Sequence, residues 1–131
     1  MLMAYKDRKY RRSRTYLESF RHAFSGLKTA FIEERNLRFH LVAAILVLFC
    51  GVFFHITKDE WLVLLICILI VMALELVNTA VERAVDAATD HFMVEAKKAK
   101  DVAAGAVLLG AVISSIIGLV IFIPYIWQWL N

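Results

Sequence analysis

The sequence predicts an all-α integral membrane protein, and three features of the chain support that prediction. Apolar residues make up 61% of the 131 residues, whereas a soluble domain has about 45–50%. They are concentrated in three runs, each long enough to cross most or all of a ~30 Å hydrocarbon layer as a helix. A shorter stretch before the first run has apolar residues at helical spacing, which is typical of a helix on a membrane surface. We therefore expect one membrane-embedded domain, residues 1–131, with a surface helix and three spans.

The chain begins with a basic tail, residues 1–14, which holds six Lys or Arg residues and one acid. Basic segments beside a membrane are attracted to anionic lipid. The expected amphipathic surface helix follows at residues 15–34, because apolar side chains recur there every three or four positions: Leu17, Phe20, Phe24, Leu27 and Phe31. A coiled-coil segment is the alternative interpretation of this stripe, although the run is short for one.

We expect membrane spans at residues 37–57, 61–82 and 102–130. Trp61 marks the start of the second span, and the aromatic residues near the C-terminus suit an interfacial end. Small residues recur every four positions in the third span, a pattern that lets helices approach closely: Ala106, Gly110, Ser114 and Gly118. So short a chain would need more than one copy to build a substantial polar site, so we also expect an oligomer.

The distribution of basic residues predicts the orientation in the membrane. Ten of the fifteen Lys and Arg residues lie before the first span or in its first turn, four lie between the second and third spans, and Lys58 alone lies between the first two. The positive-inside rule therefore puts the N-terminus and residues 83–101 in the cytoplasm and the C-terminus outside. The net charge of +3 thus reflects a membrane face, not nucleic-acid binding.

A polar stripe crosses the end of the second span, in the sequence VMALELVNTAVERAVD at residues 71–86. Glu75, Asn78, Glu82 and Asp86 fall within about 80° of one another on a helix. If Trp61 lies at one boundary of the hydrocarbon, Glu75 lies roughly 9 Å inside the other. An acid inside a span is expensive and points to function.

Three polar groups are expected at one level of the membrane: residues 33–40, the stripe, and residues 97–101. Carboxylates from two helices can hold Mg²⁺ together with phosphate oxygens, and a carboxylate in apolar surroundings suits a general base. Two other interpretations remain open, namely an ion or proton relay along the stripe and a structural subunit. Arg35 and Arg38 could also simply pair with Glu33 and Glu34. None of the common nucleotide-binding motifs occurs.

Residues 75–86 and 97–108, together with the Glu-Glu-Arg-Asn sequence at residues 33–36, resemble the prokaryotic diacylglycerol kinase family. Within it, the chain is most similar to the Gram-positive undecaprenol kinase branch. The likeness covers about residues 19–123. It implies a homotrimer of three-span subunits with sites shared between neighbours. It also implies transfer of the ATP γ-phosphate, with Mg²⁺, to a membrane lipid alcohol, either undecaprenol or, as the alternative, diacylglycerol.

The resemblance implies a role for each polar residue. Glu75 would be the general base and Asn78 would position the reacting groups. Glu34 and Glu82 would hold the Mg²⁺ on the nucleotide phosphates. The remaining nucleotide contacts would be Asp86, as a supporting residue, and Lys100, Asp101 and His91.

Two departures from the family pattern bear on these roles. The loop at residues 90–94 lacks the His-Pro often found in this branch, which bears on His91. The diacylglycerol-specific branch carries a further carboxylate where this chain has Arg38 and His40, which favours undecaprenol. Arg38 is also a candidate contact for the lipid headgroup.

Overall fold

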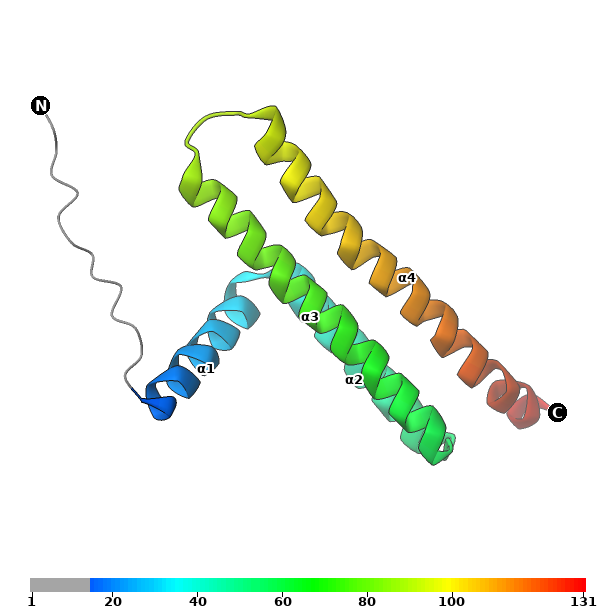
Figure 1. Ribbon diagram of the computed structural model, residues 1–131. Coiled ribbons are helices and arrows are strands. Elements are labelled where there is room, and N and C mark those ends of the chain that lie inside the picture. The colour runs from blue at the N-terminus through cyan, green and yellow to red at the C-terminus, as the bar shows by residue number, and fades with distance from the viewer. Residues whose placement is uncertain (1–14) are drawn as a thin grey trace, which may run out of the picture.

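The computed structural model describes residues 15–131, and over that range the chain forms four helices (Figure 1). Three of them are long and apolar enough to cross a membrane. The predicted all-α fold with three potential spans is thus confirmed, whereas the basic tail, residues 1–14, lies outside the described residues. The helices are α1 (Tyr16–Glu33), α2 (Arg35–Phe53), α3 (Lys58–Ala88) and α4 (Val94–Leu130).

Helix α1 leaves the bundle at a sharp bend, so that it points away from the other three helices (Figure 1). Thr15 caps its first turn by accepting a hydrogen bond from the Glu18 amide. At its other end, Arg38 Nη1 reaches back from α2 and donates to the carbonyl oxygens of Ile32 at 2.5 Å and Phe31 at 3.3 Å. These carbonyls have no partner within the helix, so Arg38 stabilises the bend.

Helices α2 and α3 are joined by a tight connection. His55 adopts a left-handed conformation (φ 51°), and the amides of His55 and Ile56 donate to the carbonyls of Val52 and Gly51. This is the hydrogen-bond pattern of a Schellman motif, which ends a helix cleanly. Helix α3 then begins with a capping box between Thr57 and Glu60.

Helix α3 is the central helix of the chain, with α2 packed on one side and α4 on another (Figure 1). In its most apolar 18-residue stretch 33% of the residues are buried, compared with 11% in the corresponding stretches of α2 and α4. At about 1.5 Å per residue, its 31 residues and the 37 of α4 exceed a ~30 Å hydrocarbon layer. Both helices therefore extend beyond the hydrocarbon at their polar ends.

Close packing of α3 and α4 depends on a small residue. A Cβ atom at Gly110 would lie 2.7 Å from Leu74 Cδ1, so glycine permits this approach. Gly118, further along the same face, has no atom within 4 Å of such a position. The small-residue face is therefore used against α3 only in part.

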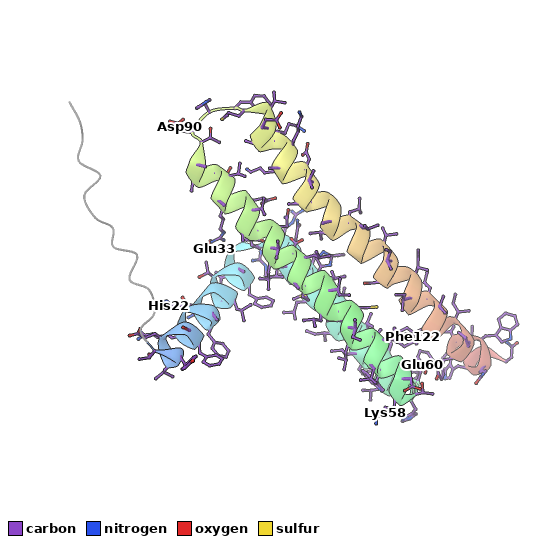
Figure 2. All side chains as sticks on the ribbon, in the orientation of Figure 1. His22, Glu33, Lys58, Glu60, Asp90 and Phe122 are labelled. Atoms are coloured by element: carbon purple, nitrogen blue, oxygen red, sulfur yellow. The ribbon has the colours of Figure 1, made fainter. Side chains whose placement is uncertain are left out.

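The two ends of the bundle differ in character. At one, which we call the Glu60 end, a core cluster of Ile56, Leu64 and Ile121 is buried. Figure 2 shows Glu60 and Phe122 together at this end, with Asp90 at the opposite one. We call the polar half of α3, from Glu75 onwards, the Glu75 end. Between them, α2 and α4 expose many large apolar side chains, as expected for surfaces that face lipid or another subunit.

Candidate functional site

Three polar residues of α3 are buried, and they lie within a little more than one helical turn. Glu75 is 3% exposed, and Asn78 and Thr79 are each 6% exposed. Glu82 is half-buried and Asp86 is exposed. The predicted stripe therefore passes from the interior of the bundle to its surface as α3 rises. Because an unpaired buried polar group is destabilising, the surroundings of each residue indicate what the site is built to hold.

The carboxylate of Glu75 faces polar groups of α2. The side chains of Asn36 and His40 lie near it. Glu34, at the junction of α1 and α2, and Glu82, two turns along α3, also lie within electrostatic range, and as carboxylates they repel it. Two further acids from different segments of the chain, Glu34 and Glu82, therefore lie near the buried carboxylate of Glu75.

Asn78 is held on one side only. Its Nδ2 donates to Glu82 Oε1 at 3.3 Å, while its Oδ1 is buried and has no hydrogen-bond partner among the described residues. A buried acceptor without a partner destabilises a protein by about 1–3 kcal/mol. An orphaned oxygen one helical turn from Glu75 is therefore the strongest sign that this site receives a ligand with a hydrogen-bond donor.

Arg83 connects the site to the junction of α1 and α2. Its Nη2 donates to Glu33 Oε2 at 2.8 Å and to Glu34 Oε1 at 2.9 Å. Figure 2 shows Glu33 at the end of α1, next to α3. The expectation that Arg35 and Arg38 pair with these glutamates is therefore wrong. Arg38 binds carbonyls of α1 instead, and Arg83 takes the glutamates because the bend brings them against α3.

The start of α4 contributes the other charged groups. Lys100 Nζ binds Asp86 Oδ1 at 2.5 Å, across the gap between α4 and α3. Lys97 binds Asp101 one turn along α4, as their spacing of four residues allows. The tertiary structure thus joins the end of the stripe to the basic segment of α4.

The loop between α3 and α4 holds its own polar contacts. Thr89 Oγ1 donates to the carbonyl of His91, and His91 Nδ1 shares a 2.9 Å hydrogen bond with Asp90 Oδ1. This bond lowers the pKa of the Asp90 carboxyl from its ordinary value. His91 is exposed and makes its hydrogen bond within the loop, so these contacts give no support to its predicted contact with nucleotide.

The acids fit a divalent cation only in company with a further ligand. Within residues 15–131, no group of three His, Cys, Asp or Glu side chains could hold a metal ion. Mg²⁺, however, is usually bound by one or two carboxylates and by substrate phosphates. Glu34 and Glu82 match that pattern, and the orphaned Asn78 Oδ1 beside Glu82 offers an acceptor for a water on the ion.

An open apolar cavity of about 560 Å³ lies between α2, α3 and α4. It extends from Phe39 and His40 towards Leu119 and Phe122 near the Glu60 end. His40 lines it and also lies near Glu75. His40 therefore links this apolar space to the buried carboxylate, whose other neighbours include the acids Glu34 and Glu82.

The sequence pattern of the prokaryotic diacylglycerol kinase family matches residues 21–122 of this chain, a range that includes every polar residue described above except those of the capping segment at Thr15 and Glu18. This protein belongs to that family. The match bears out the resemblance drawn from residues 33–36, 75–86 and 97–108. It identifies the chain as a bacterial membrane protein, in agreement with its three potential spans.

Three relatives illustrate the range of similarity. The undecaprenol kinase of Bacillus subtilis is 47% identical over 109 residues, which cover 83% of this chain and 89% of the relative. The diacylglycerol kinase of Synechocystis is 40% identical over 109 residues, 82% of this chain and 62% of that longer protein. The diacylglycerol kinase of Escherichia coli K12 is 26% identical over 95 residues, 72% and 78% of the two chains.

Sequence reasoning did not single out several residues that border the site. Asn36 and His40 lie near Glu75, Thr79 is buried beside it, and Arg83 binds the two glutamates. A signal for Thr79 existed, since it lies four residues after Glu75 and shares its face. No local signal exists for Arg83, whose partners are about fifty positions earlier.

Proposed function

We propose that this protein is an undecaprenol kinase, which transfers the γ-phosphate of ATP to the hydroxyl of undecaprenol at the membrane surface. The observation that carries the proposal is the buried pair of Glu75 and Asn78, with an orphaned amide oxygen. Near this pair are an apolar cavity, through His40 in its lining, and a cluster of charged groups. A lipid alcohol can approach from the first and ATP from the second. Family membership and the Bacillus subtilis relative support the same activity.

On the lipid side, Glu75 is the general base. Its carboxylate takes the proton of the lipid hydroxyl as the oxygen forms a bond to the γ-phosphorus and the bond to ADP breaks. Positioned general bases contribute about 10²–10⁴-fold to the rate of such a step. Asn78 positions the reacting groups through its unpaired Oδ1, which can accept a hydrogen bond from the lipid hydroxyl or from a bound water.

On the nucleotide side, the chain supplies both signs of charge. Glu34 and Glu82 would hold Mg²⁺, which when bound neutralises charge on the ATP phosphates. Lys100 and Asp101 contact the nucleotide, and Asp86 supports the site by orienting the ammonium group of Lys100. His91 remains a further candidate for nucleotide and Arg38 for the lipid headgroup. Catalysis of this kind depends mainly on positioning and on charge neutralisation.

The assembly proposed for this site is a homotrimer in which neighbouring subunits share sites. Residues 1–131 form one lipid kinase domain, with α1 lying on the membrane surface. In support, α1 exposes Phe20 and Phe24 at 64% and 70%, and α2 and α4 expose large apolar faces within the chain. The N-terminus is cytoplasmic, because among the Lys and Arg residues of the described range, 15–131, Lys58 alone lies at the Glu60 end.

A direct assay tests the proposal and its alternative. Purified protein is supplied with Mg²⁺ and labelled ATP, and undecaprenol and diacylglycerol are offered side by side in mixed micelles. We expect label in undecaprenyl phosphate at a higher rate than in phosphatidic acid. A preference for diacylglycerol would make the protein a diacylglycerol kinase. Transfer of label to neither lipid would reject the proposal that the protein is a lipid kinase.

A further inference from the structure

Arg83 hydrogen-bonds a carboxylate oxygen that the proposed metal site needs as a ligand. Its Nη2 hydrogen-bonds Glu34 Oε1 as well as Glu33 Oε2, and it directly follows Glu82 on α3. Within residues 15–131 no other Lys or Arg forms an ion pair with Glu33 or Glu34. The guanidinium of Arg83 therefore binds Glu34, one of the two carboxylates proposed to hold the cation. In the sequence, Arg83 is adjacent to the other, Glu82.

The ion pair between Arg83 and Glu34 can be displaced easily by another cation. The side chains of Arg83, Glu33 and Glu34 are 46%, 56% and 28% exposed, and ion pairs at such exposure contribute little net stability. A divalent cation that also binds nucleotide phosphates competes well for the same oxygen. Of the two glutamates, Glu34 is the more buried and lies within electrostatic range of Glu75.

We propose that Arg83 is a positioning residue that exchanges with the divalent cation at Glu34. Without the cation, its guanidinium pairs with both glutamates and keeps the α1–α2 junction against α3. When the metal–nucleotide complex binds, Glu34 passes to the cation while Arg83 remains on Glu33, next to the nucleotide phosphates. The inference rests on the proposed function, in which Glu34 is a metal ligand.

The exchange is tested by binding of Mn²⁺ to the purified full chain in detergent, in the presence of a non-hydrolysable ATP analogue and measured by electron paramagnetic resonance. Arg83→Gln frees Glu34 Oε1 and is expected to raise Mn²⁺ affinity about two- to fivefold, the scale of an exposed ion pair. Arg83→Lys keeps a cation at the same place and is expected to restore the original affinity.

A matched control separates the exchange from general electrostatics. Arg35→Gln removes one positive charge directly beside Glu34 from an exposed side chain that forms no ion pair in the described structure. We expect at most a small change in Mn²⁺ affinity. An equal gain in Arg35→Gln and Arg83→Gln, or no gain in Arg83→Gln, overturns the exchange. If the ion pair were purely structural, Arg83→Gln would lower thermal stability without raising Mn²⁺ affinity. That result is the absence of a gain, which overturns the exchange.

A double-mutant cycle distinguishes failure of this inference from failure of the proposed site. Glu34→Gln alone is expected to weaken Mn²⁺ binding, and adding Arg83→Gln to it is expected to give no gain. A gain that persists in the double variant overturns the exchange at Glu34. Unchanged Mn²⁺ affinity in Glu34→Gln would instead remove Glu34 from the proposed metal site.

Discussion

Helix α3 carries two glutamates, Glu60 and Glu75, in opposite environments. Glu60 Oε2 accepts hydrogen bonds from the Thr57 amide at 2.8 Å, the Thr57 hydroxyl at 2.9 Å and the Tyr125 hydroxyl at 2.6 Å. Glu75 is almost fully buried, and its neighbour Asn78 has an orphaned oxygen. The carboxylate with a full set of partners fixes helix ends. Glu75, beside an acceptor without a partner among the described residues, is the carboxylate that we propose acts on a ligand.

The largest expected effect comes from removing the carboxylate of Glu75, in contrast to that of Glu60. Glu75→Gln keeps the shape of the side chain but removes the proton acceptor, so we expect kcat to fall by about 10²–10⁴-fold. The matched control is Glu60→Gln at the other end of α3, which should retain turnover within about twofold. Lipid phosphorylation with labelled ATP measures both. Full activity of Glu75→Gln would exclude Glu75 as the general base.

The next effect concerns the metal requirement at the Glu75 end. Glu34→Gln and Glu82→Gln each remove one proposed ligand, and we expect the Mg²⁺ concentration for half-maximal rate to rise by at least about tenfold. Glu95→Gln is the control, because Glu95 is exposed, pairs with Lys98 on its own helix and has no proposed metal contact. An unchanged Mg²⁺ dependence in both variants contradicts the metal assignment.

A smaller effect is expected where α4 meets the stripe. Lys100→Gln breaks the ion pair with Asp86 and removes a proposed phosphate contact, so the KM for ATP should rise several-fold with little change in that for lipid. Lys98 forms an ion pair only with Glu95 on its own helix, so Lys98→Gln should leave both constants unchanged. Equal KM values for ATP in the two variants would show that Lys100 has no special role.

The smallest expected effect lies at the Glu60 end. Tyr125→Phe removes one hydrogen bond between α4 and the start of α3 but leaves the capping box in place. We expect the thermal midpoint to fall by a few degrees at most, with kcat and both KM values unchanged. A loss of activity without a loss of stability would mean that this end communicates with the site.

Local features of the sequence account for much of the fold and for part of the site. The three apolar runs predict the helices that can span a membrane, since length and hydropathy suffice for that. The spacing of Glu75, Asn78 and Glu82 predicts a shared face, because helical periodicity is a local property. The pairing of Arg83 with Glu33 and Glu34 could not be predicted, because nearer arginines stand beside the same glutamates.

By itself, the sequence determined the all-α membrane class, the polar stripe on α3 and the family to which the chain belongs. Each follows from composition, periodicity or motif, which need no knowledge of long-range contacts. Only the tertiary structure decided which polar groups have partners. Packing of α2 and α4 on α3 buries Glu75, leaves Asn78 Oδ1 unpaired, and joins Asp86 to Lys100. Hydrogen bonds are short and directional, so they depend on the relative positions of helices that no local pattern specifies.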